Sequence, residues 1–256
     1  MSASVHRLEA LRRRLASLED GRRGDVHRFD FGCPALDQGL GALGVGALHE
    51  LYAETDADAP AMTAFALGLA ARAARGRPIV WSLQDMTARE TGEPYGLGLA
   101  ELGIDPEAVL MVRVRHAADL LAVGEEALRH GGVGAVVLSA WGEAKAFTLT
   151  ASRRLALAAR DGTTAFLARA SAQPSPGAAE SRWIVRSAPS TPLEAGAPGR
   201  PAFSATLSRH RRGGEPRTWN LEWDREQRSF VEPAPLSGGV ASVSADRADQ
   251  GLRRAG

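Results

Sequence analysis

The stretch that decides the fold is residues 49–83, HELYAETDADAPAMTAFALGLAARAARGRPIVWSL. Its apolar pattern predicts a buried strand over 47–52, a helix over 63–75 that ends at Gly76, and a second buried strand over 78–83. In many nucleotide-binding proteins, a strand, loop and helix in this order carry a loop that grips phosphate. Here the loop after Tyr52 is filled instead with acids, alanines and a proline.

The same alternation of strands and helices continues outward from this stretch to residue 169. Further strands are predicted over 109–114, 133–141 and 164–169, with helices over 97–102, 117–130 and 150–160. Strands that alternate with helices favour right-handed crossovers and a parallel sheet covered on both faces.

The pattern changes on either side of this alternating region. A short strand at 29–31 and a brief helix at 35–40 precede it, and a strand at 182–188 follows it. Residues 203–224 predict a β-hairpin with Gly213 and Gly214 in its turn. We therefore divide the chain into three parts. Residues 1–28 form an N-terminal amphipathic helix with its linker, and residues 29–235 form a central α/β domain with antiparallel C-terminal strands. Residues 236–256 are a serine- and glycine-rich tail that we expect to be disordered.

Composition narrows the classes of function. The 256 residues carry a net charge of +1, so no overall field favours nucleic acid or membrane. Cys33 is the only cysteine, which excludes an intrachain disulfide and a thiolate metal cluster. No apolar run reaches the roughly 18 residues of a membrane span, and the N-terminus lacks the apolar centre of a secretory signal. We expect a cytoplasmic protein without membrane contact.

The loop after Tyr52 does not fit a phosphate-binding P-loop. Counting forward from Tyr52 places Ala59 and Pro60 at the lysine and hydroxyl positions, whereas counting back from Gly76 places Ala61 and Met62 there. Both alignments lack the glycines and the lysine, and Pro60 also lacks an N–H donor.

Charge argues against phosphate in the same loop. Three carboxylates lie where a triphosphate would sit, namely those of Glu54, Asp56 and Asp58. Each like charge costs on the order of 1 kcal/mol at a partly solvated site. The missing lysine forfeits charge-assisted hydrogen bonds worth roughly 1.5–3 kcal/mol apiece. We therefore expect no ATP binding at this loop.

The other positions that ATP hydrolysis needs are also altered. In such ATPases, an acid at the end of the second core strand activates water. The equivalent position here falls near Gln84, which is not an acid, and Asp85 one residue later is interpreted as a loop residue or helix cap. The carboxylate that helps hold Mg²⁺ after an apolar strand is replaced by Ser139. None of the six histidines has zinc-ligand spacing, and His49 is interpreted as structural. The sequence thus predicts no catalytic residue, no metal, no cofactor and no enzyme activity.

Two segments are candidates for contact with a partner protein. Leu8, Leu11, Leu15 and Leu18 form an apolar stripe at helical spacing, which would serve either a partner or the chain's own domain. Trp219 and Trp223 on the hairpin, and Phe230 after it, are aromatic residues of the kind enriched at interfaces. The alternative for the tryptophans is that they close the edge of the core.

Several of these segments together resemble a known family. FGCPALDQGLGALGVGALHELYA, residues 31–53, resembles the opening of the RecA ATPase core. More specifically, GALHELYA, VWSLQD, GLGLAELGIDPEAVLMVRV, AVVLSAW, SRWIVRSAPS and RTWNLEWD are similar to the ImuA family. The resemblance covers about residues 5–230 and implies a RecA-like three-layer sandwich with a mostly parallel central sheet.

The resemblance also implies a function. ImuA proteins accompany ImuB, a polymerase relative without catalytic carboxylates, and an error-prone DnaE-type polymerase in the SOS response, where they copy past DNA lesions. It implies an assembly protein that contacts ImuB, with RecA and a second copy of the chain as further candidate partners. Loops 141–149 and 171–181 correspond to the DNA-binding loops of RecA-type cores, but the second has no basic or aromatic residue. We therefore expect weak or no direct DNA binding.

Two alternatives stay open from the sequence. One is a regulator similar to SulA, a RecA-like protein without nucleotide chemistry that blocks the division protein FtsZ. The other is an ATPase with an unusual phosphate site.

Overall fold

A nine-stranded sheet forms the centre of the protein in a computed structural model, which describes residues 28–191, 197 and 199–233. The strand order is β11-β10-β9-β8-β3-β7-β6-β4-β5. The strands are β3 (Leu48–Ala53), β4 (Ile79–Gln84), β5 (Val109–Val114), β6 (Ala135–Trp141), β7 (Thr164–Ala170), β8 (Ser181–Ser187), β9 (Ala202–His210), β10 (Arg217–Asp224) and β11 (Ser229–Val231).

The sheet has a parallel part and an antiparallel part. From β8 through β3, β7, β6 and β4 to β5, each neighbouring pair is parallel. The pairs β8–β9, β9–β10 and β10–β11 are antiparallel. This arrangement confirms the predicted fold class, a mostly parallel α/β sheet with antiparallel C-terminal strands.

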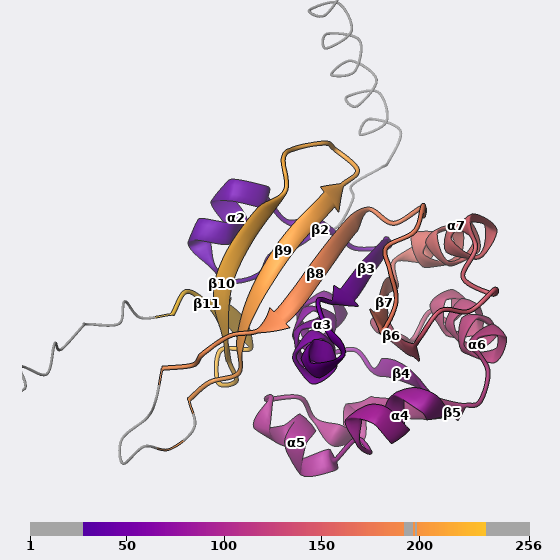
Figure 1. Cartoon of the computed structure of the whole chain (residues 1–256), viewed down its shortest axis with the longest axis horizontal. Helices are drawn as coiled ribbons and strands as arrows, with labels where there is room; N and C mark the ends of the chain where they lie inside the picture. Colours follow the sequence, from indigo (N-terminus) through magenta and orange to yellow (C-terminus); the bar gives the residue numbers. More distant parts are fainter. Residues whose placement is uncertain (1–27, 192–196, 198, 234–256) are drawn as a thin grey trace, which may run out of the picture.

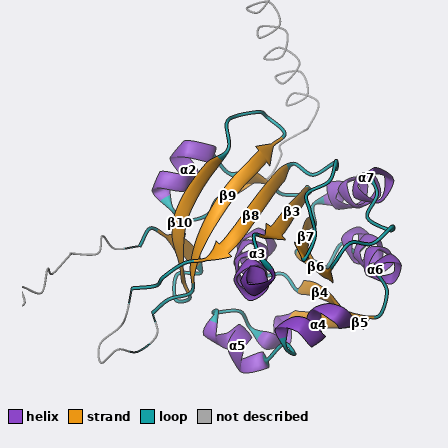
Figure 2. Ribbon diagram, viewed as in Figure 1, coloured by secondary structure: helices purple, strands orange, loops and turns teal. Residues whose placement is uncertain are grey.

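Helices cover the parallel part on both faces and make three layers (Figures 1 and 2). One face packs on α3 (Ala59–Ala74), and α4 (Asp85–Thr91) and α5 (Gly96–Glu101) lie near it toward the β4–β5 edge. The other face packs on α6 (Ala117–Arg129) and α7 (Leu149–Ala158). A small pair of strands, β1 (Arg28–Phe29) and β2 (Leu43–Gly44), flanks the short helix α2 (Pro34–Leu40).

The two faces of the sheet belong to separate cores, because successive side chains of a strand point to opposite sides. Leu51 and Ala53 of β3 belong to the core under α3, whereas Leu48 belongs to the core under α6 and α7. The core under α3 is rich in aromatic rings, which also join β8, β9, β10 and β11 to the helix. Fully buried members of this group include Phe65, Trp183, Phe203, Trp223 and Phe230.

A glycine lets α3 approach the antiparallel strands closely. A Cβ atom on Gly68 would lie 3.0 Å from ring atoms of both Trp223 and Phe230. Any larger side chain there would push the helix away from the aromatic rings. Close packing of this kind is sensitive to even one added methyl group.

The structure differs from the sequence predictions at several places, among them the following three. Helix α3 begins at Ala59, four residues before the predicted start at Thr63. The reason is that Ala59-Pro60-Ala61 suits a first helical turn, because a backbone N–H at the position of Pro60 would have no partner within the helix. Helix α4 was not predicted, since its residues 85–91 are mostly polar. The strand β11 was not predicted, since only three residues of it pair.

Some predictions concern residues outside the described part of the chain. The N-terminal amphipathic helix with Leu8, Leu11, Leu15 and Leu18, and the tail over 236–256, lie outside it and stay predictions. In the part of the chain that the structure describes, no helix combines the length and the apolar character that crossing a membrane needs.

Candidate functional site

The loop between β3 and α3 is closed by the side chain of Asp58. One carboxylate oxygen, Oδ2, accepts hydrogen bonds from the backbone N and the hydroxyl of Thr55, at 3.1 and 2.7 Å. The other, Oδ1, accepts from the backbone N and the hydroxyl of Ser187 on β8, at 2.9 and 3.0 Å. A carboxylate of the chain thus accepts from Thr55 and Ser187 at the loop where a nucleotide-binding protein would hold phosphate.

Burial raises the pKa of Asp58, but the hydrogen bonds from Thr55 and Ser187 outweigh this effect and hold the pKa below its ordinary value. The two other acids of this loop also have partners on neighbouring segments. Asp56 accepts a hydrogen bond from Ser171 at 3.3 Å, and Glu54 lies 3.7 Å from Arg186. The loop therefore presents a network of carboxylates rather than a ring of free N–H donors.

The residues aligned with the P-loop lysine and hydroxyl belong to the first turn of α3. Ala59 and Met62 are buried in the core, with 0% and 2% of their surface exposed. Pro60 is exposed and Ala61 is half-buried. In either alignment, at least one of the two positions faces the protein interior and not a ligand.

The two positions that lack an acid have structural hydrogen bonds. The side-chain oxygen of Gln84, at the end of β4, accepts from the backbone N of Trp141 at 3.3 Å. The hydroxyl of Ser139 is buried on β6 and accepts from the indole N–H of Trp81 at 2.9 Å. Asp85 is the first residue of α4, and its carboxylate accepts from Arg113 at 2.9 Å. These side chains hold neighbouring elements together.

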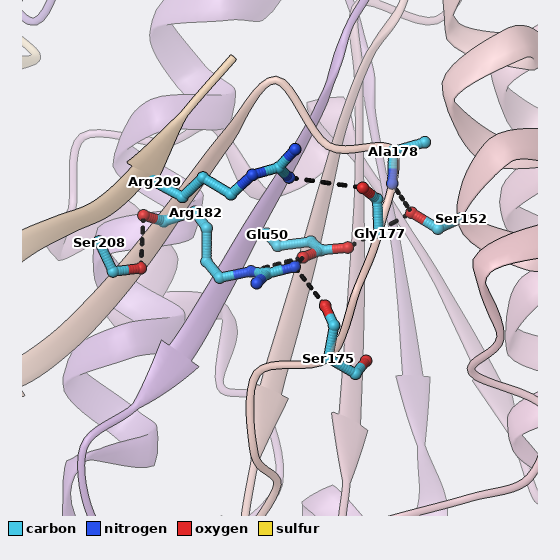
Figure 3. A network of polar contacts seen from close by, with 8 residues as sticks. All are labelled: Glu50, Ser152, Ser175, Gly177, Ala178, Arg182, Ser208 and Arg209. Atoms are coloured by element: carbon cyan, nitrogen blue, oxygen red, sulfur yellow. Dashed lines mark hydrogen bonds and ion pairs between the residues drawn. The ribbon is translucent and has the colours of Figure 1, made fainter. Parts of the chain in front are cut away.

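The segment after β7, for which the resemblance to RecA-type cores predicts the position of a DNA-binding loop, is anchored along its length (Figure 3). Arg182 donates to the carbonyl of Ser175, and Arg209 donates to the carbonyl of Gly177 at 3.4 Å. The backbone N of Ala178 donates to the hydroxyl of Ser152 on α7 at 2.8 Å. Nearer β7, the backbone N of Gln173 donates to Glu143 at 2.7 Å.

A buried ion pair supports this anchored segment (Figure 3). Arg182 donates from Nε and Nη2 to one oxygen of Glu50, at 2.9 and 2.7 Å. The Glu50 side chain is 4% exposed, and the hydroxyl of Ser152 donates to its other oxygen at 3.4 Å. No local signal in the sequence marks this pair, because its members lie 132 positions apart.

A second arginine lies beside the pair on the same face of the sheet. Arg169 of β7 is 2% exposed, contacts the Phe147 ring with its guanidinium 4.3 Å from the ring centre, and donates to Glu143 at 2.8 Å. Burial, with the nearby Glu50 carboxylate, raises the pKa of the Tyr52 phenol in this cluster. The small cavity between these groups holds about 20 Å³, about the room that one water needs.

The aromatic partner candidates are buried in the chain's own core. Trp223 and Phe230 are 2% and 0% exposed, with their ring centres 4.8 Å apart, and Trp219 is 8% exposed. The indole N–H of Trp223 donates to the carbonyl of Leu102 at 2.8 Å. This burial corrects the interpretation of these three as an exposed surface for a partner, because their apolar area is already covered. They close the edge of the core, the alternative that the sequence left open for the tryptophans.

His49 has the structural environment expected for it. It is 0% exposed, and its ring nitrogens lie 2.8 Å from the hydroxyl of Ser181 and 3.1 Å from the carbonyl of Gly44. Burial lowers its pKa. Among the described residues, no three His, Cys, Asp or Glu side chains group as metal ligands would.

Fold and site together define a class: an α/β protein in which the position of a phosphate loop is closed by the chain's own side chains. No family model matches the chain. It is 36% identical over 227 residues to Protein ImuA of Caulobacter vibrioides strain NA1000 / CB15N, which covers 80% of this chain and 87% of that protein. The same values hold for Protein ImuA of strain ATCC 19089 / CIP 103742 / CB 15 of this species. The chain belongs to the ImuA family.

Proposed function

We propose that this protein is a non-enzymatic assembly protein of an error-prone translesion synthesis complex, and that it contacts an ImuB-type polymerase relative. RecA and a DnaE-type polymerase are the further partners in this proposal. It rests on membership of the ImuA family for the process, and on the closed β3–α3 loop for the absence of catalysis.

The observation that carries the non-enzymatic part is the fourfold hydrogen bonding of Asp58. A phosphate group would have to displace this carboxylate or lie beside it, and two anions in contact repel each other. The anchored segment 171–180 supports the second part of the proposal, that direct DNA contact is weak. Segments that track single strands need positive charge and aromatic rings, and this one has neither.

Co-purification tests the proposed partner. The full chain with an affinity tag is expressed together with ImuB and, separately, with FtsZ, and the proteins retained after washing are compared. We expect retention of ImuB and no retention of FtsZ. Retention of FtsZ alone would replace the proposal with the SulA-like alternative.

Calorimetry tests the absence of nucleotide chemistry. Titration of the purified chain with Mg-ATP is expected to give no heat of binding at micromolar protein. Titration of the Asp58→Asn variant is the matched control, because it removes the competing charge but restores no lysine, and it should also give none. Micromolar affinity in the parent chain would show an active phosphate site.

A further inference from the structure

An apolar cleft of about 310 Å³ lies between the first half of α3, strand β4 and the segment with α4 and α5. Its walls include Leu67, Trp81, Leu83, Tyr95, Leu99 and Leu102. This volume is at the lower end of the ligand clefts found in proteins, which run from about 300 to 1,000 Å³. The cleft is thus large enough to take several side chains of a partner segment.

The polar side chains that line the cleft leave few groups to recognise a polar ligand. The hydroxyls of Thr63 and Thr91 donate to backbone carbonyls one helical turn earlier, at 2.9 and 2.8 Å. The hydroxyl of Thr87 donates to the carbonyl of Ser139 at 3.3 Å. Because these donors are used within the fold, the cleft suits aliphatic side chains better than a hydrogen-bonding small molecule.

The walls of the cleft continue into exposed apolar surface with negative charge around it. Tyr95 is 65% exposed and Leu97 is 61% exposed. Residues 85–102 contain four carboxylates and one arginine, a net charge of −3. Asp85 and Glu93 are paired with Arg113. The other two carboxylates, those of Glu90 and Glu101, have no ion pair within the described part of the chain.

Residues 5–18 of this chain have the complementary chemistry. Their sequence, VHRLEALRRRLASL, contains four arginines and one glutamate, a net charge of +3. Leu8, Leu11, Leu15 and Leu18 form one stripe if the segment is helical. We propose that this segment docks on its own domain, with the leucine stripe in the α3–β4–α5 cleft and the arginines toward Glu90 and Glu101.

The chain is long enough for this contact. Arg75, just after the last residue of α3, donates to the backbone carbonyl of Arg28, so the described chain starts beside that end of the helix. The cleft lies along the first half of α3, whose 16 residues span about 24 Å at the usual helical rise. The nine residues from 19 to 27 reach up to about 30 Å when extended. The linker can therefore run the length of α3.

Pairs of engineered cysteines test the docking in the full chain. Tyr95→Cys is combined with Leu11→Cys, or with Arg13→Cys as the matched control, because residue 13 lies roughly opposite the leucine stripe on a helix of 3.6 residues per turn. The native Cys33 is 1% exposed and does not compete. Under mild oxidation, we expect the 11–95 pair to form a disulfide in several times the yield of the 13–95 pair.

The same experiment distinguishes docking within one chain from docking between copies. A link within one chain runs as a monomer on a non-reducing gel, and its yield does not fall on dilution. A link found only in dimers, or equal yields for the two pairs, would overturn the proposal. Dimers that form with the 11–95 pair alone would instead place the stripe on a neighbouring copy.

A second measurement uses the cleft without a cross-link. The single variant Tyr95→Cys is labelled with a thiol reagent in the parent background and with Leu8→Asp and Leu15→Asp added. We expect the two aspartates to increase the labelling rate at position 95 several-fold, because they remove the covering segment. Leu157→Cys on α7, where the native side chain is 55% exposed, is the control whose rate should not change. An unchanged rate at position 95 would contradict the docking.

Discussion

The two faces of the central sheet use different chemistry at the same strands. Under α3, the core of β3, β8, β9 and β10 is apolar and aromatic, and Phe65, Phe203 and Phe230 meet in it with ring centres 4.9–6.2 Å apart. On the opposite face, near α7, β3 and β8 contribute the buried ion pair of Glu50 and Arg182. The difference shows that one strand can support non-specific burial on one side and a specific polar anchor on the other.

The two faces also hold different parts of the protein in place. The apolar face fixes the sheet and α3, whereas the charged face fixes the segment 171–180. The stabilisation from the apolar contacts scales with the area removed from water and does not depend on the direction of any one contact. The charged contacts depend on every partner being present.

The largest effect is expected on the apolar face. Phe230→Ala should lower the free energy of unfolding by about 4 kcal/mol, because a fully buried ring is replaced by a cavity. Phe230→Leu should lose much less, since it keeps most of the volume. Urea unfolding monitored by circular dichroism measures both. Equal stability of Phe230→Ala and the parent would show that this ring does not belong to the core.

A smaller but specific loss is expected on the charged face. Glu50→Gln should cost about 3 kcal/mol, because it leaves the Arg182 charge buried without its counter-ion. Glu54→Gln is the matched control, since its pair with Arg186 is exposed on both sides, and should change stability little. Adding Arg182→Met to Glu50→Gln should recover most of the loss. If the double variant were no more stable than the single one, the pair would not act as a unit.

The loop at the carboxyl end of β3 should give a pH-dependent effect. Asp58→Asn should cost about 1–2 kcal/mol at neutral pH, the range for losing a capping carboxylate. Because the pKa of Asp58 is lower in the folded protein than its ordinary value, its contribution is present above that ordinary value and is lost as pH falls through the folded pKa. The parent should therefore lose more stability than Asp58→Asn on acidification below about pH 4. Asp56→Asn is the control: it keeps Asp58 and should lose stability on acidification as the parent does. Equal loss in the parent and in Asp58→Asn would contradict this.

The smallest effect is expected at an exposed pair of threonines on the antiparallel strands. The hydroxyls of Thr206 on β9 and Thr218 on β10 lie 2.7 Å apart on an exposed surface. Thr218→Val keeps the shape and the strand preference, so the free energy of unfolding should change by no more than about 0.5 kcal/mol. Thermal unfolding at fixed concentration measures it. A large loss would indicate that this face is covered in solution.

The apolar half of this comparison could be predicted from the sequence. The strand positions around Leu51, Val137 and Phe166 follow from short apolar runs, and the change to a hairpin follows from the turn at Gly213 and Gly214. In the sequence, Trp219 and Trp223 fit either a partner surface or the edge of the core, and Phe230 is a candidate for a partner surface, because enrichment of aromatics at interfaces and in cores gives the same sequence signal.

The charged half could not be predicted in the same way. Glu50 and Arg182 lie on strands that become neighbours only through the sheet order, and nothing local in the sequence pairs them. Asp58 is a different case. The spacing Thr55-x-x-Asp58 is a helix-capping signal that can be recognised in the sequence alone, and it marks the residue that closes the loop.

The closed loop has a consequence for how this scaffold can change over time. Placing a lysine at residue 59 would put a cation at a position with 0% exposure, and Asp58 beside it would keep its four donors. Opening this loop to a nucleotide would thus take several replacements together, because a lysine at residue 59 alone would be buried beside a carboxylate that already has its donors.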